Sequence, residues 1–304
     1  MKPRFTSACI LLAIAAAFSL AGTAAAQEGT LKKVKDTATI TIGHRDASLP
    51  FSYYDDKQQP IGYAMDLCAR IVDAVKAELK LPKLDVKYQL VTSANRIPLM
   101  ANGTIDLECG STTNNIPRQE QVWVTITHFV TANRWISKKA SNIKTLQDLK
   151  GKTIVSTAGT TNIKQATEIN AAQSLGMNII SANGHAEAFQ MVETGRAVAF
   201  VMDDILLAGL AAQARAPNDY EISALGLSVE PYGIMLRKDD KAFKAVVDRA
   251  MANVYSSGQI NAIWEKWFQK PVPPKGINMN LPMPAMFKKV VAKPTDSGDP
   301  KAYE

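Results

Sequence analysis

Strands and helices alternate in two successive runs along this chain, and this alternation limits the possible folds more than any other feature of the sequence. In the first run, residues 39–43 alternate between polar and apolar side chains, as a half-buried strand does. Three apolar residues between positions 67 and 75 then recur at four-residue spacing, which is the spacing of one helix face. The same run predicts strands over residues 86–91 and 105–109 and a short helix over 96–102.

A second run of the same kind begins near residue 150. Its predicted strands cover residues 152–156, 178–181 and 197–202, and its predicted helices cover 162–175, 187–193 and 203–214. A strand over residues 232–236 then leads back to the first unit, and residues 243–268 have helical apolar spacing interrupted at Gly258. Such alternation is typical of mostly parallel sheets flanked by helices. The Pro-rich end, residues 271–304, is expected to lie along a surface.

The two α/β units are expected to be joined twice. Residues 125–134 lead out of the first unit, and residues 227–232 lead back into it. We therefore predict a discontinuous lobe 1 of residues 27–131 and 232–304, and a continuous lobe 2 of residues 132–231. A ligand site is expected in the cleft between such lobes, at loops that follow the carboxyl ends of strands.

Residues 1–26 have the composition of an export signal. Lys2 and Arg4 precede an apolar run, and three alanines at 24–26 then supply the small residues that favour cleavage by signal peptidase. We predict that these residues form a signal peptide and that the soluble, exported chain begins near Gln27. No later segment offers the roughly 18 consecutive apolar residues of a membrane-spanning helix.

Two cysteines, Cys68 and Cys109, lie beyond this signal. In an exported protein the pair is compatible with one disulfide and equally with two buried free thiols, and the sequence leaves both open. Without Lys2 and Arg4 the formal charge falls by two, from +7 to +5, and the basic residues are scattered. Binding to nucleic acid or to a membrane surface is therefore not expected.

The usual signatures of enzymes and metal sites are missing from the sequence. Residues 150–153 contain Gly-Lys-Thr without the earlier glycine of a phosphate-binding loop. Neither Gly-x-Ser-x-Gly nor His-Glu-x-x-His occurs, and His44, His128 and His185 lie too far apart for a metal-binding motif. We therefore expect no catalytic residues, no metal and no cofactor.

Two polar loops follow predicted strands, one in each unit. Residues 111–115 and 159–162 both precede helical sequence, where short hydroxyls and free backbone N–H groups hold an anion or simply cap the helix. Arg118 suits either a bound carboxylate or a solvated surface position, and Asp203 suits either a ligand amine or a helix cap. An arginine in one lobe and an aspartate in the other would together complement an α-amino acid.

With these loops in view, the sequence resembles the periplasmic glutamate/aspartate-binding proteins that serve ABC importers, within solute-binding protein family 3. The matching motifs run through nearly the whole mature chain and lie at residues 43–45, 50–55, 92–99, 108–115, 159–161, 195–200, 202–204 and 235–240. The resemblance implies the type II periplasmic-binding-protein fold, in which two crossings form a hinge between two α/β lobes. It also implies a periplasmic, monomeric protein that captures L-glutamate or L-aspartate and delivers it to an ABC permease complex at the inner membrane.

The resemblance also implies roles for nine residues. The ligand's α-carboxylate would be held by Arg118, Thr113 and Thr161, and its ammonium group by Asp203 and Ser111. The side-chain carboxylate would be surrounded by Arg45, Ser93, Arg96 and His185. A second carboxylate in a cleft needs its own cations, because otherwise the cost of its desolvation remains uncompensated.

Other interpretations remain open on the sequence alone. The cleft would also suit another amino acid, and the closed form would also suit docking on a sensor domain instead of a permease. A dehydratase-type enzyme on the same fold would need a general acid, for which His185 and Asp203 are the candidates.

Overall fold

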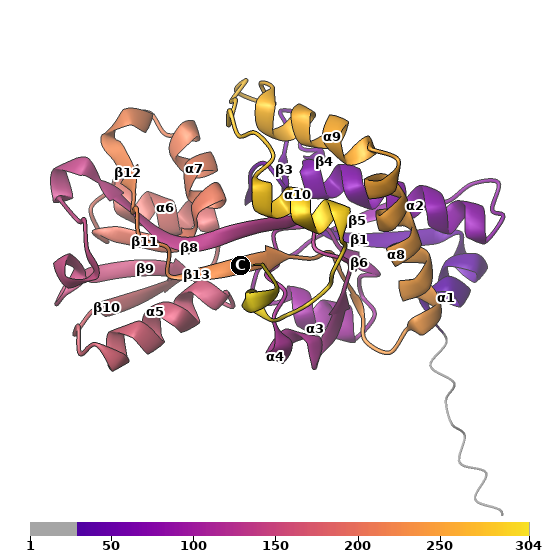
Figure 1. Cartoon of the computed structure of the whole chain (residues 1–304), viewed down its shortest axis with the longest axis horizontal. Helices are drawn as coiled ribbons and strands as arrows, with labels where there is room; N and C mark the ends of the chain where they lie inside the picture. The colour runs from indigo at the N-terminus through magenta and orange to yellow at the C-terminus, as the bar shows by residue number, and fades with distance from the viewer. Residues whose placement is uncertain (1–28, 304) are drawn as a thin grey trace, which may run out of the picture.

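The structure is a computed structural model that describes residues 29–303. It contains two main β-sheets that an antiparallel pair of strands connects (Figure 1). Within the described range, no helix combines the length and the apolar composition needed to cross a membrane. The predicted signal peptide lies outside the described residues.

The first sheet combines strands from the beginning and from the end of the described chain. Its strands are β1 (Thr39–His44), β5 (Asp85–Leu90), β6 (Leu107–Glu108), β7 (Val122–Val124) and β14 (Met235–Arg237). They lie in the order β5-β1-β6-β14-β7. β1 is parallel to β5 and β6, whereas β14 is antiparallel to β6 and β7.

The second sheet is formed by the middle of the chain. Its strands are β8 (Phe129–Lys138), β9 (Thr153–Thr157), β10 (Asn178–Ala182), β11 (Ala199–Asp203), β12 (Tyr220–Ile222) and β13 (Ser228–Tyr232). The order is β10-β9-β11-β8-β12, and β13 also pairs with β8. β9 is parallel to β10 and β11, and β8 is antiparallel to its three partners.

The antiparallel pair of β8 and β13 connects the two halves of the molecule. Its register runs from Ser228 opposite Asn133 to Tyr232 opposite Phe129. In Figure 1 the two strands lie side by side between the two bodies. The limits that the sequence predicts for the lobes, at 131/132 and 231/232, therefore fall inside this pair of strands.

Helices flank both sheets, which confirms the predicted α/β class. The helices around the first sheet are α1 (Thr30–Thr37), α2 (Tyr63–Glu78), α3 (Arg96–Ala101), α4 (Ile116–Gln119), α8 (Lys241–Ser256), α9 (Gln259–Trp264) and α10 (Ala285–Ala292). The second sheet carries α5 (Thr161–Ala172) on one side and α6 (His185–Glu193) with α7 (Asp204–Gln213) on the other (Figure 1). The four-residue spacing in α2 has its expected effect, since Leu67, Ile71 and Val75 are fully buried. Such a helix is held mainly by the burial of this apolar face.

Several segments differ from the sequence prediction, including residues 129–134 of β8, which were expected as part of a connection between the two units. The expected strand over residues 232–236 is divided, because Tyr232 ends β13 and Met235 begins β14. α1 was not predicted, since it buries only Val34 among its apolar side chains. α10 was not predicted either, because two apolar contacts in a Pro-rich segment produce no visible periodicity.

The C-terminal segment packs against the core more closely than its composition suggests. Phe287 of α10 is buried and stacks on Trp264, with the ring centroids 5.1 Å apart. Further along, the backbone N–H of Thr127 donates to the carbonyl of Thr295 at 2.8 Å, and the hydroxyls of Tyr303 and Thr127 are 2.6 Å apart. The end of the described chain therefore lies beside the start of the hinge.

Cys68 and Cys109 form a disulfide, which decides between the two alternatives that the sequence left open. Their Cα atoms are 6.3 Å apart, and 41 positions separate them along the chain. The bond ties α2 to the residue that follows β6. It therefore anchors the start of the polar loop at residues 111–115.

Replacing both cysteines with serine is expected to lower the free energy of unfolding by about 2–4 kcal/mol, because an open chain loses more conformational entropy on folding than a cross-linked one. Urea unfolding of the oxidised parent and of Cys68→Ser/Cys109→Ser would measure the difference. Dithiothreitol should lower the urea midpoint of the parent to that of the variant and leave the midpoint of the variant unchanged. Equal urea midpoints for the oxidised parent and the variant would contradict a stabilising bond.

Candidate functional site

The nine residues that the sequence analysis singled out are buried around the boundary between the two bodies, apart from partly exposed Thr161. A small cavity with a volume of about 10 Å³ lies between the two bodies. Seven of the nine residues line it: Ser93, Arg96, Ser111, Thr113, Thr161, His185 and Asp203. Arg45 and Arg118 are not among the residues that line it. This volume is about the space that one water molecule needs, so the two bodies must separate to admit a larger solute.

Local structure explains why these side chains meet. Arg45 directly follows β1, Ser111 and Thr113 follow β6, and Asp203 is the last residue of β11. Thr161 begins the helix after β9. Since β1 and β6 are parallel neighbours, as β9 and β11 are, their carboxyl ends bring these residues to facing edges of the two sheets.

The two polar loops cap the helices that follow them and also line the cavity. The side chain of Asn115 accepts from the backbone N–H of Arg118 at 2.9 Å and caps α4. Thr160 caps α5 in the same way by accepting from the N–H of Ile163 at 3.2 Å. Thr113 and Thr161 line the cavity, and Thr160 lines it as well. The capping interpretation is therefore confirmed for Asn115 and Thr160, and anion binding by the loops stays a prediction.

Arg45 and Arg96 carry buried positive charge that the protein does not fully pair. Their Nε and Nη1 atoms have no hydrogen-bond partner among the described residues, and the same holds for the hydroxyls of Ser93 and Ser111. Leaving charged donors buried and unpaired is costly, so such a set indicates the place of an anionic ligand. Burial, and secondarily the charge of Arg96, lower the pKa of Arg45 to about 10, which keeps it cationic near neutral pH.

Glu108 is a buried acid that the sequence analysis did not assign. Its Oε1 lies 4.0 Å from Nη1 of Arg96, and its Oε2 accepts from the hydroxyl of Thr112 at 2.6 Å. Oε1 has no hydrogen-bond partner in the part of the chain that the structure describes. Glu108 therefore offsets part of the arginine charge without occupying the arginine donors. Its position at the end of a two-residue strand gave no sequence signal of this role.

Arg118 links the two bodies. Its Nη1 donates to the carbonyl of Thr113 at 2.7 Å, and its Nη2 donates to the carbonyl of Gly159 at 3.2 Å. Burial, followed by the charge of Arg96, lowers the pKa of Arg118 to about 9, so the side chain is still charged at neutral pH. The hydroxyls of Thr113 and Thr161 are also 3.4 Å apart across the same boundary. The structure therefore shows the two bodies in contact around the cavity.

His185 lies between Thr157 and Arg45. Its Nδ1 is 2.8 Å from the Thr157 hydroxyl, and its Nε2 is 3.5 Å from Nη2 of Arg45. Burial and then the charges of Arg45 and Arg96 lower the pKa of His185 well below its usual value. The ring is therefore neutral at pH 7, which does not suit a general acid.

Asp203 forms the acidic side of the cavity. It accepts hydrogen bonds from the hydroxyl of Tyr232 and from Nδ2 of Asn162, the latter at 2.8 Å. Burial and then the charge of Glu230 raise the pKa of Asp203 to about 7. Asp204, which adjoins it, faces elsewhere and pairs with Arg134 at 3.0 Å.

Glu230 is a second acid that the sequence analysis missed. It lies buried in β13, where its Oε2 accepts from Thr161 at 3.0 Å and its Oε1 accepts from Gln165 at 2.7 Å. Tyr232 and Asn162 were missed as well. An acidic residue in a hinge strand has no distinguishing sequence pattern, so only the fold reveals these contacts.

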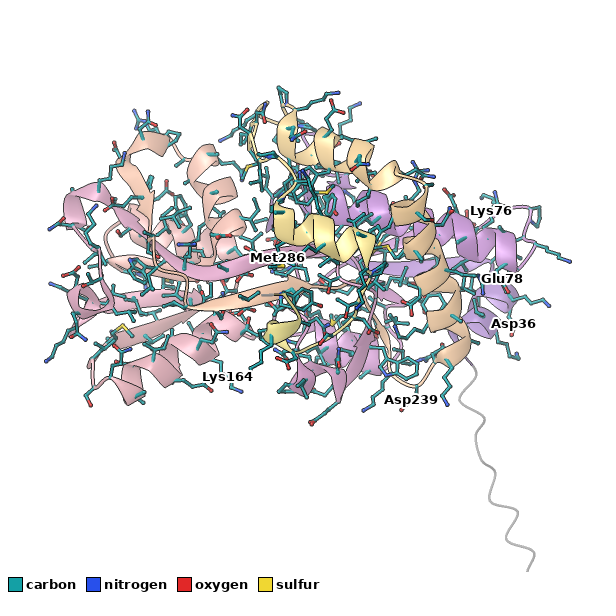
Figure 2. The ribbon with its side chains drawn as sticks, in the orientation of Figure 1. Asp36, Lys76, Glu78, Lys164, Asp239 and Met286 are labelled. Atoms are coloured by element: carbon teal, nitrogen blue, oxygen red, sulfur yellow. A yellow bond between two sulfur atoms is a disulfide. The ribbon has the colours of Figure 1, made fainter. Side chains whose placement is uncertain are left out.

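Ionisable side chains of this protein lie both at its outer surface and deep in its interior. Lys76, Glu78 and Asp239 are labelled at the outer surface (Figure 2). Arg45, Arg96 and Asp203, in contrast, are almost completely buried. Buried charges are retained where partners or ligands compensate them. The side chains around the cavity therefore complement a small molecule with at least one carboxylate and one cationic group.

Known proteins resemble this chain over most of its length. Residues 40–270 match the family described as bacterial extracellular solute-binding proteins, family 3. An L-glutamate/L-aspartate-binding protein of Pseudomonas aeruginosa is 55% identical over 269 residues, covering 88% of this chain and 89% of its relative. A glutamate/aspartate import solute-binding protein of Escherichia coli is 45% identical over 291 residues, covering 95% and 96%.

Solved structures show the same fold. An ancestral arginine-binding protein bound to arginine matches with a TM-score of 0.68 and 26% identity, covering 76% of this chain and 98% of that one. The fold and the family that the sequence resemblance implied are thereby confirmed. The curated relatives are solute-binding proteins rather than enzymes, as we expected.

Proposed function

We propose that this chain, which belongs to family 3 of the bacterial extracellular solute-binding proteins, captures L-glutamate or L-aspartate and delivers it to an ABC permease complex. The protein would act as a monomer in the periplasm, after removal of the signal peptide. The relatives described as glutamate/aspartate-binding proteins support this ligand class. The observation that carries the proposal is the set of unpartnered donors on the buried Arg45 and Arg96, of which Arg96 lines one cavity together with the buried Asp203.

The ligand's three charges match three parts of the site. Arg118, with the hydroxyls of Thr113 and Thr161, would hold the α-carboxylate. Asp203 and Ser111 would take the ammonium group. The side-chain carboxylate would accept from the free donors of Arg45, Arg96 and Ser93, with the neutral ring of His185 beside them. Charge-assisted hydrogen bonds of this kind are roughly twice as strong as neutral ones.

Capture would proceed by closure of the two lobes. We propose that residues 27–131 and 232–304 move as lobe 1 and that residues 132–231 move as lobe 2, about the hinge strands β8 and β13. A ligand that touches both lobes binds the closed form more tightly than the open form and so shifts the population toward closure. A differential affinity of about 10⁴-fold would move a 1:99 equilibrium to 99:1.

The dehydratase alternative would need a general acid. Burial lowers the pKa of His185 well below its usual value, so its neutral ring is a poor acid, whereas burial raises the pKa of Asp203 to about 7 and leaves it as the candidate. The relatives are described as solute-binding proteins, which favours binding over catalysis. A sensor module would use the same cavity and the same ligand, so it differs only in the partner of the closed form. Transport of labelled glutamate into cells that lack this protein, compared with cells that carry it, distinguishes import from sensing.

A panel of the twenty amino acids, each at 1 mM, tests the ligand class by thermal unfolding. With a micromolar Kd, 1 mM glutamate adds about 4.1 kcal/mol to the stability of the folded state. For a chain of this size we expect a rise in Tm of about 8–16 °C with glutamate or aspartate. Glutamine and asparagine should raise Tm far less. A larger rise with any neutral or basic amino acid would refute the assignment.

Glutamate affinity is expected to weaken as the pH falls below 7. Without ligand, burial and the charge of Glu230 hold the pKa of Asp203 at about 7, whereas a bound ammonium group lowers it. Binding at pH 6 must therefore expel a proton, and we expect a Kd about tenfold weaker at pH 6 than at pH 8. Calorimetry in buffers of different ionisation enthalpy should show about one proton released at pH 6. A Kd that is constant over this range would contradict the ammonium contact.

A further inference from the structure

Helix α7 contains one glycine among residues that mostly have high helix propensity. Gly209 lies in the interior of α7, among alanine and leucine residues. Its φ does not lie in the left-handed region, so the backbone conformation itself does not require glycine. A glycine at such a position destabilises a helix relative to alanine. Its presence therefore calls for a reason outside the helix.

Close approach of the other body supplies that reason. A Cβ atom on Gly209 would lie 2.7 Å from the carbonyl oxygen of Leu49 and 3.1 Å from its Cδ2. Leu49 directly follows β2 (Ala47–Ser48) and precedes β3 (Ser52–Tyr54), which belong to a small sheet in the first body. The carbonyl is backbone and cannot rotate away as a side chain can. At the observed spacing of the two bodies, position 209 therefore has no room for a side chain.

Gly159 makes a second contact of the same kind. A Cβ atom there would lie 2.6 Å from Cα of Ala94 and 2.7 Å from the carbonyl oxygen of Ser93. Gly159 also has a φ of +73°, so alanine at this position is strained whether or not the lobes are closed. Position 209 provides the cleaner test, because alanine suits its helical conformation.

We propose that Gly209 determines ligand affinity by allowing the lobes to close fully. The inference rests on the proposed function, in which closure captures the ligand. An added methyl group at position 209 would hold the lobes apart without touching any residue that lines the cavity. It would also strengthen α7. The closed form would therefore lose stability while the ligand-free protein kept or gained it.

Gly209→Ala should weaken the Kd for glutamate by about 5- to 150-fold, the range that corresponds to the usual cost of one over-packed methyl group. The ligand-free Tm should stay the same or rise. Gly226→Ala is the matched control, because its Cβ would meet Ala132 at 3.5 Å, an ordinary contact within the same body. This control should bind like the parent. Unchanged affinity in Gly209→Ala would overturn the proposal.

Cysteine cross-linking measures closure without any ligand. The hydroxyls of Thr113 and Thr161 are 3.4 Å apart, so Thr113→Cys/Thr161→Cys should form a bond whenever the lobes meet. Adding Gly209→Ala should slow this cross-linking several-fold, whereas adding Gly226→Ala should not. Equal rates with and without Gly209→Ala would overturn the role of Gly209. A parent that binds no acidic amino acid, combined with slower cross-linking in Gly209→Ala, would overturn the proposed function alone.

Discussion

Replacing Arg118 with methionine is expected to weaken the binding of every amino acid by about 30- to 4,000-fold. Removing one partner of a buried, hydrogen-bonded charge pair costs about 2–5 kcal/mol, which sets this range. The effect is general because the α-carboxylate is common to all amino acids. The variant also loses the donation from Arg118 to the carbonyl of Gly159, which spans the two bodies. Calorimetry with glutamate, aspartate and glutamine measures the losses.

Arg249→Met is the matched control for this substitution. The Arg249 side chain is 64% exposed and pairs at 2.7 Å with Glu78, which Figure 2 labels at the outer end of α2. Losing an exposed ion pair of this kind costs little, so this variant should bind like the parent. Circular dichroism checks that both variants are folded. Normal glutamate affinity in folded Arg118→Met would show that the α-carboxylate lies elsewhere.

Replacing Arg45 or Arg96 with methionine is expected to remove the preference for acidic side chains. Each substitution should weaken glutamate and aspartate binding by about 30- to 4,000-fold, again from the cost of an unpaired buried charge. Glutamine binding should change much less, because an amide carries no charge that these arginines must neutralise. The quantity to compare is the ratio of the glutamine Kd to the glutamate Kd, measured by calorimetry for each variant.

Arg96 requires an additional variant, because its removal leaves Glu108 without its nearest cation. Arg96→Met/Glu108→Gln removes both charges and so avoids an unpaired buried carboxylate. If Arg96→Met loses glutamate only because Glu108 is left unpaired, the double variant will recover the parent affinity. If Arg96 binds the ligand, the double variant will remain weak. Loss of glutamine binding equal to the loss of glutamate binding in Arg45→Met would contradict the assignment of the side-chain carboxylate.

The sequence predicts the fold of this protein well, because periodic burial produces most of its elements. α2 illustrates this, since its four-residue spacing is the direct consequence of packing Leu67, Ile71 and Val75 on one side. The alternation of strands and helices likewise predicts the two sheets. α10 was missed because its burial depends on Phe287 reaching Trp264, a contact between segments that no local pattern encodes.

The candidate site is predictable only in part. Arg118 and the two polar loops stand out, because hydrogen-bonding residues in a row after a buried strand have no role in a core. Glu108 and Glu230 do not stand out, since an isolated acid is ordinary in sequence and becomes unusual only when the fold buries it. The role of Gly209 is equally hidden, because it depends on the distance to Leu49 in the other body.

Titration of the unmodified mature protein with glutamate and with glutamine tests the central claim most directly. The two ligands have nearly the same shape and differ in one negative charge. The ratio of their affinities therefore shows whether buried cations bind the side-chain carboxylate. We expect glutamate to bind at least about 30-fold more tightly than glutamine, the lower limit for an uncompensated buried charge pair. Equal affinities would show that Arg45 and Arg96 do not receive the ligand's side chain.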